Sequence, residues 1–198
     1  MINQLAGHIS RYLTFQGFCS EDDEELVTYG LSSILSDILQ VLVLLIVAIP
    51  LGVLFEMAAF AVFYGLLRPN IGGAHANSHL QCLVIFTSVA IVAVVAAIHI
   101  PLAVIPILAP ALTLVGLIIV FIRAPIAHPN VPKSQASLRK IRKKARIIVV
   151  LEFICITVCS VVLPGNLLSL AVCANFGVTV AVATLLIPIK NERGENHE

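Results

Sequence analysis

The chain has 198 residues, of which 59% are hydrophobic and 12% charged, and its formal net charge is +1 at pH 7. A soluble domain carries about twice that fraction of charged residues, so the composition excludes a large soluble domain. The apolar residues form runs long enough to cross a bilayer, and these runs predict an all-α, polytopic membrane protein with about five to six membrane-embedded helices and an N-terminal amphipathic helix. Residues 1–198 are expected to form a single integral membrane domain.

Residues 1–30 are predicted to form an interfacial segment. Apolar side chains recur there at roughly helical spacing, separated by polar residues, at Ile2, Leu5, Ile9, Tyr12 and Leu13. Two interpretations remain open: an amphipathic helix lying in the membrane interface, or a helix packed on the protein's own core. An acidic cluster at residues 21–25 follows, and we interpret it as a loop or the start of a helix.

The next apolar run covers residues 31–67, and it is interrupted by Pro50 and Gly52. One alternative is a single tilted span from about Val41 to Leu67. The other is a pair of short crossings, or a re-entrant pair, that turns near residues 49–52. Glu56 lies inside this run, and a carboxylate in a bilayer is costly and often functional; its other interpretation is a protonated or hydrogen-bonded structural glutamate.

Four further membrane runs are predicted at 80–99, 102–122, 147–163 and 167–189. Between them, residues 123–146 are expected to form a basic loop, with cations at Lys133, Arg139, Lys140, Arg142, Lys143, Lys144 and Arg146. Short basic loops stay on the cytoplasmic side. Because two spans separate this loop from the segment near residue 75, that segment is placed on the same side.

The basic loop has several interpretations. It can act as a topology signal that contacts membrane lipid headgroups, and it can also attract an acidic peptide. We expect no nucleic-acid binding, because the cluster lacks interleaved aromatic residues and a domain to present it. The five cysteines are scattered and odd in number, which argues against a disulfide framework. No regular metal-ligand spacing is present, so neither a metal nor a cofactor is expected.

The polar segment from Arg68 to Cys82 is the candidate active site. It is the one place in the sequence where a thiol and histidines come close together. A thiolate is the nucleophilic form of cysteine, and a nearby imidazole or a helix N-terminus favours it. His79 precedes Cys82 by three residues, so the two share a helix face, and spacing alone favours it as the base. His75 reaches Cys82 only if the chain bends back, for which glycines at 72 and 73 give the freedom.

Two sequence motifs resemble those of a known family. The pattern Arg68-x4-Gly73-x-His75-x6-Cys82 is similar to the signature of the accessory gene regulator B (AgrB) family of membrane peptidases. The pattern Ala124-Pro125-x3-Pro129-Asn130-x-Pro132 resembles that family's second recurrent motif. This chain has Ile126-Ala127-His128 where family members commonly carry an acidic residue, so no loop carboxylate is expected to take part.

The resemblance implies a multi-pass cysteine peptidase of the bacterial cell membrane, with its active site at the cytoplasmic side. Cys82 would be the nucleophile and His75 the general base, while Arg68 and Gly73 match supporting positions. His79 would line the site, and Glu56 stays a candidate supporting residue. The enzyme would remove the C-terminal tail of an AgrD-like precursor and help to close a thiolactone or lactone ring for a quorum-sensing signal. The resemblance also allows a homodimer. The alternative function is a small non-enzymatic membrane transporter or scaffold.

Overall fold

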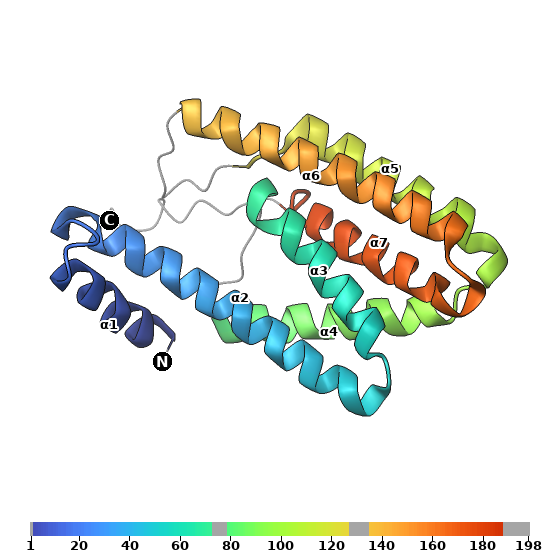
Figure 1. Ribbon diagram of the computed structural model, residues 1–198, viewed down its shortest axis with the longest axis horizontal. Coiled ribbons are helices and arrows are strands. Elements are labelled where there is room, and N and C mark those ends of the chain that lie inside the picture. Colours follow the sequence, from blue (N-terminus) through green and yellow to red (C-terminus); the bar gives the residue numbers. More distant parts are fainter. Residues whose placement is uncertain (1, 73–78, 127–134, 188–198) are drawn as a thin grey trace, which may run out of the picture.

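The computed structural model of the protein describes residues 2–72, 79–126 and 135–187, which are helical apart from short connections (Figure 1). The seven α-helices are α1 (Ile2–Phe15), α2 (Glu24–Leu51), α3 (Leu54–Ile71), α4 (His79–Ile98), α5 (Ile105–Arg123), α6 (Gln135–Val162) and α7 (Leu168–Ala183). Short 3-10 turns precede α2, α5 and α7, at Glu21–Asp23, Leu102–Val104 and Gly165–Leu167. The described part contains no named β-strand, and the predicted all-α fold is confirmed.

Apolar helices make this a membrane-embedded protein. Among the described residues, four helical stretches are long and apolar enough to cross a membrane: Glu24–Leu51, Leu80–Ile98, Leu102–Arg123 and Ser137–Val162. The shorter apolar helix α7 adds to them. Large apolar side chains point outward from these helices, with Ile107 and Ile122 about three-quarters exposed. Such a surface is stable against lipid and would be a liability in water.

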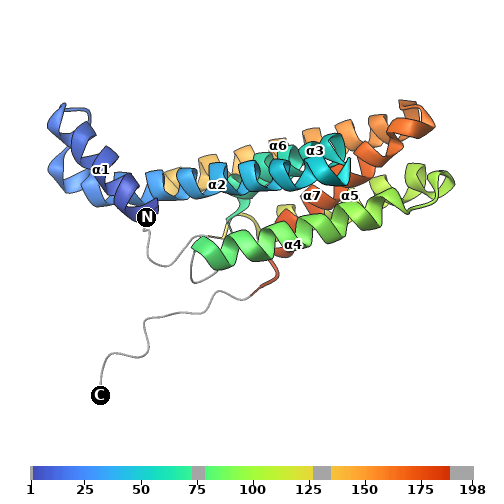
Figure 2. The same cartoon turned by 90° about the horizontal axis from the view of Figure 1, so that it is seen from below.

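Helix α7 lies at the centre of the bundle. It contacts α3, α4, α5 and α6, and in Figure 2 it lies between an upper row that contains α3 and a lower row formed by α4 and α5. Gly177 lets α7 approach α3 closely, because a Cβ at this position would lie 2.4 Å from the carbonyl oxygen of Phe60. Removing the side chain at the contact is how membrane helices commonly gain close packing.

A buried polar contact joins α7 to α5. The Asn175 side chain donates from Nδ2 to the carbonyl oxygen of Ala109 over 2.9 Å and also to Oγ1 of Thr113. Both Asn175 and Thr113 are fully buried. A hydrogen bond inside an apolar bundle fixes the register of two helices that hydrophobic packing alone would leave less well defined.

Helices α2 and α3 form an antiparallel hairpin. The turn is at Gly52, which adopts a left-handed conformation with φ of 68° and ends α2. The N–H of Gly52 bonds to the carbonyl of Ile49, and that of Val53 to the carbonyl of Ala48. Of the two alternatives for residues 31–67, the hairpin that turns near residues 49–52 is therefore correct, and a single span from Val41 to Leu67 is wrong.

The basic segment differs from the predicted loop. Helix α6 begins at Gln135, so residues 135–146 form its first turns and are not part of a loop that extends to residue 146. Ala, Leu, Lys and Arg are strong helix formers, which explains why this charged stretch continues the apolar helix behind it. The prolines Pro125, Pro129 and Pro132 all precede the helix.

Helix α1 packs on the start of α2. Its buried residues Ala6 and Ser10 face the rest of the protein, and Ser10 Oγ donates to the carbonyl oxygen of Glu24 over 3.0 Å. The opposite side exposes Tyr12 and Phe15. The helix therefore combines features of both alternatives for residues 1–30, because it packs on the protein and presents an apolar, aromatic surface outward.

Candidate active site

Cys82 lies in the first turn of α4, where this helix meets α2 and α3. Its thiol is half-buried. The Gln40 side chain, which is 6% exposed, donates from Nε2 to Cys82 Sγ over 3.4 Å. Gln40 belongs to the buried stripe of α2, which continues with Leu44 and Ala48, and this stripe points the amide into the bundle.

Arg68 is the cation of the site. It lies in the last turn of α3, and its Nη1 donates to the carbonyl oxygen of Gly72. Arg68 is also within hydrogen-bonding reach of Tyr64, and it interacts electrostatically with Asp37 of α2. Tyr64 is close enough to Cys82 for the two groups to interact electrostatically. Three helices thus contribute a thiol, an amide, a phenol, a carboxylate and a guanidinium to one region.

Aromatic rings form an apolar wall beside this polar group. The ring centroids of Tyr64 and Phe86 are 4.6 Å apart, and those of Phe60 and Phe86 are 6.0 Å apart. Phe86 lies one helical turn beyond Cys82 and is 6% exposed. Interlocked rings hold α3 and α4 together. The positions of Tyr64 and Cys82 are therefore set by packing as well as by polar contacts.

The end of α3 is tied to the second sequence motif. The N–H of Ile126 bonds to the carbonyl oxygen of Ile71 over 3.0 Å, and Gly72 pairs with Ile126 in a parallel bridge. Gly72 has φ of 72°, and a Cβ there would meet the carbonyl oxygen of Ile126 at 2.3 Å. Only glycine fits this backbone and this approach. The Ala124-Pro125 start of the second motif is therefore held against the first motif.

Cys82 and Arg68 are the predicted site residues that the structure brings into one region. Glu56 lies at the other end of α3, about 18 Å from Arg68 along the helix axis, where it accepts a hydrogen bond from Ser169 Oγ over 3.1 Å. Gly73, His75 and the side chain of His79 lie outside the described residues, so the choice between the two histidines stays a prediction. Within residues 2–72, 79–126 and 135–187, no group of three or more His, Cys, Asp and Glu could hold a metal ion.

Sequence reasoning missed three residues of this region: Asp37, Gln40 and Tyr64. A signal for two of them was present. Asp37 and Gln40 are polar residues within a strongly apolar run, and polar side chains inside a membrane helix are costly unless they have a function or a partner. Tyr64 gave no such signal, because a tyrosine near the end of a membrane helix is common at the interface.

Comparison with known families now adds to this geometry. The family described as accessory gene regulator B matches residues 2–188. The chain belongs to the accessory gene regulator B family. No curated protein and no solved structure matches the chain. Membership of the accessory gene regulator B family supports a role in the production of a quorum-sensing signal, and it covers both motifs discussed above.

Proposed function

We propose that the protein is a membrane cysteine peptidase that removes the C-terminal tail of an AgrD-like precursor and passes the remaining acyl group to an internal nucleophile of that precursor. The observation that carries this proposal is the position of Cys82, whose thiol meets the Gln40 amide within the region that contains Arg68. Membership of the accessory gene regulator B family supports the same conclusion.

In the proposed reaction, Cys82 Sγ attacks the carbonyl carbon of the peptide bond that precedes the tail. His75 accepts the thiol proton and returns it to the amine as the carbon–nitrogen bond breaks. The tail leaves, and the rest of the precursor stays on Cys82 as a thioester. An internal cysteine thiol or serine hydroxyl of the precursor then displaces Cys82 and closes a thiolactone or lactone ring.

The surroundings of Cys82 favour ring closure over hydrolysis. The apolar wall of Phe60, Tyr64 and Phe86 borders the site, and an apolar wall limits the access of water to a thioester. The Glu56 carboxylate accepts a hydrogen bond from Ser169 at the far end of α3. We therefore propose the peptidase as the single function, with its active site on the cytoplasmic side.

The test uses membranes that contain the protein and a synthetic AgrD-like precursor. Mass spectrometry follows loss of the tail and the covalent adduct of the precursor with the protein. We expect both to disappear in Cys82→Ala and His75→Ala and to persist in His79→Ala. Loss in His79→Ala with activity in His75→Ala would reassign the base. Full cleavage by Cys82→Ala would refute the peptidase mechanism.

A further inference from the structure

We infer that Gln40 is a catalytic residue that stabilises the oxyanion formed when Cys82 attacks the precursor; this inference rests on the proposed peptidase function. Gln40 is a neutral side chain that is almost completely buried in an apolar helix. Its amide points at the sulfur of Cys82, at 3.4 Å. A buried amide at a nucleophilic sulfur has a use in acyl transfer beyond packing.

The geometry follows from the chemistry of the attack. When Cys82 Sγ bonds to the carbonyl carbon, the electron pair of the C=O double bond moves to the oxygen, which becomes negative. That oxygen is one bond from the carbon attached to Sγ. A donor that already touches Sγ therefore comes within hydrogen-bonding distance of the oxygen. The Nε2–H of Gln40 donates a hydrogen bond in this state and loses it when the C–N bond breaks and the carbonyl re-forms.

The other groups near Cys82 are less suited to this task. Arg68 is engaged with the carbonyl oxygen of Gly72 and with Tyr64. Asp37 is an acceptor when charged and would oppose an oxyanion. Gln40 has two N–H donors, one of which bonds to Cys82 Sγ; it carries no charge to be neutralised in an apolar setting, and it is fixed in place by the buried stripe that it shares with Leu44. Preorganised neutral donors of this kind are effective in water-poor sites.

The test separates the chemistry of the oxyanion from the reactivity of the thiol. Gln40→Met preserves the volume of the side chain and removes the donor. We expect single-turnover formation of the acyl-enzyme to fall by about 10²–10³-fold in this variant. Alkylation of Cys82 by iodoacetamide forms no oxyanion, so its rate should fall much less than the rate of acylation, by no more than the lost hydrogen bond to Sγ accounts for. The matched control is Leu44→Met, one turn further along the same stripe, which should preserve both rates.

Each other outcome has a defined meaning. Unchanged acylation in Gln40→Met would overturn the oxyanion role. Equal loss of acylation and alkylation would also overturn it, because Gln40 would then act only on the thiol. The proposed function fails separately, in Cys82→Ala: if this variant still cleaves the precursor, no nucleophilic role for Cys82 remains. If Cys82→Ala does not cleave the precursor, the proposed function stands, and the acylation rate of Gln40→Met alone tests the oxyanion role.

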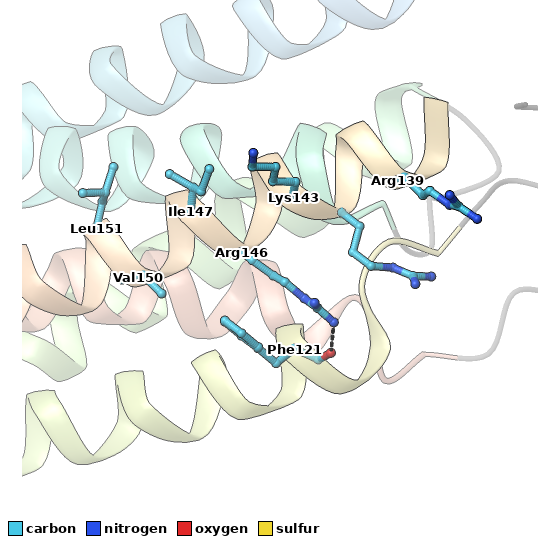
Figure 3. Close-up of a pocket in the computed structure, with 8 residues that line it drawn as sticks. Phe121, Arg139, Lys143, Arg146, Ile147, Val150 and Leu151 are labelled. Carbon is cyan, nitrogen blue, oxygen red and sulfur yellow. Dashed lines mark hydrogen bonds between the residues drawn. The ribbon is translucent and has the colours of Figure 1, made fainter. Parts of the chain in front are cut away.

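A second, independent observation concerns a cleft between α5 and α6, with a volume of about 480 Å³. It is lined by Phe121, Arg139, Arg142, Lys143, Arg146, Ile147, Val150 and Leu151 (Figure 3). The four cations come from the first turns of α6, and the apolar side chains follow along the same helix. We propose that this cleft binds an anionic phospholipid, with its phosphate at the cations and an acyl chain along the apolar wall.

Arg146 shapes the cleft. Its Nη2 donates to the carbonyl oxygen of Phe121 over 3.0 Å, and its guanidinium carbon lies 4.9 Å from the centre of the Phe121 ring. Arg146 is thus held in place, whereas Arg142 and Lys143 are exposed. Within the described part of the chain, no carboxylate forms an ion pair with these three cations. Their charge is therefore available to an anion from outside this part of the chain.

A lipid fits this cleft because of its position. Ile147 and Leu151 are exposed on a helix that is long and apolar enough to cross the membrane, so they face acyl chains. Basic pockets between helices at the cytoplasmic side bind anionic headgroups. Cations above an apolar wall match a molecule that is anionic at one end and apolar along the rest. An acidic peptide would match the cations alone.

The test measures lipid preference of the full chain in nanodiscs that contain phosphatidylglycerol and phosphatidylcholine in equal amounts. Electron paramagnetic resonance with spin-labelled forms of each lipid reports the fraction bound at the protein surface. In Arg142→Gln with Lys143→Gln, the preference for phosphatidylglycerol should fall by about fivefold for each cation removed. The matched control is Lys140→Gln with Lys144→Gln, on the same helix but outside the cleft, which should retain most of the preference.

Three results would overturn the lipid site. An equal fall in both double variants would show general attraction of the membrane surface to α6. An unchanged preference in the Arg142 and Lys143 variant would exclude the cleft as a lipid site, and binding of a polyglutamate peptide that depends on the same two cations would then assign it to an acidic chain. If free glycerol phosphate displaced the spin-labelled lipid as effectively as phosphatidylglycerol does, the apolar wall of the cleft would not contribute to binding.

Discussion

Replacing Gly177 by alanine tests the close packing of α3 on α7. A Cβ at this position would lie 2.4 Å from the carbonyl oxygen of Phe60 and 3.1 Å from the nitrogen of Tyr64, whereas ordinary contact begins at 3.4 Å. The two helices must therefore separate by about 1 Å, and overpacking of this kind costs about 1–3 kcal/mol. The higher helix propensity of alanine returns about 1 kcal/mol, so the net loss of unfolding free energy should be at most about 2 kcal/mol.

The same displacement should reach the active site, because Tyr64 and Arg68 belong to the displaced helix. A misplacement of about 1 Å can lower the rate of a positioned reaction by about 10²-fold. The acyl-enzyme formed with the precursor measures this effect, and thermal unfolding followed by circular dichroism in detergent micelles measures stability. Both readouts should fall in Gly177→Ala.

The matched control is Gly65→Ala on α3 itself. A Cβ there would have nothing within 4 Å, so this variant should gain about 1 kcal/mol from helix propensity and retain its acylation rate. Equal stability of Gly177→Ala and Gly65→Ala would refute the reasoning, because it would mean that α3 and α7 are not in the tight contact described.

Three further predictions follow from the same contacts. Gly72→Ala should lose about 1–3 kcal/mol of unfolding free energy, because its backbone is left-handed and faces a carbonyl oxygen; urea unfolding in micelles measures this loss, and wild-type stability would contradict it. Arg68→Lys should acylate about tenfold more slowly, since it preserves the charge facing Asp37 but loses the fork that reaches Gly72; a wild-type rate would argue against this positioning. Asn175→Ala should unfold at a free energy about 1–3 kcal/mol lower, because its two buried hydrogen bonds disappear, and unchanged thermal stability would show that they contribute nothing.

The helices of the membrane region were predictable because a bilayer demands long apolar runs, and those runs are visible in the sequence. The run at 80–99 corresponds to α4 within one residue at each end. The hairpin turn at Gly52 was one of two alternatives, since a proline and a glycine suggest a break without excluding a bent span. The central place of α7 was not predictable, because hydropathy does not distinguish a helix buried in protein from one that faces lipid.

The active site was predictable in part. Cys82 and Arg68 lie close together in the sequence within a polar segment, so local reading found them. Gln40 and Asp37 come from α2, and the approach of Gln40 to Cys82 and of Asp37 to Arg68 depends on how α2 packs on α3 and α4. No spacing rule within the sequence encodes such a contact between residues separated by 42 positions. The basic segment was misread as a loop because charge was given more weight than helix propensity.

The contact between α3 and α7 also sets an order for assembly. Ser169 meets Glu56 across a separation of 113 positions in the chain, so α3 leaves the ribosome long before its main partner does. Contacts between distant segments form late, because the loop between them must close first. Helix α3 therefore lacks its main partner in the membrane until α7 arrives. Completion of the last described helix finishes the packing of α3, which carries Tyr64 and Arg68, and a chain truncated before it would hold Cys82 without that support.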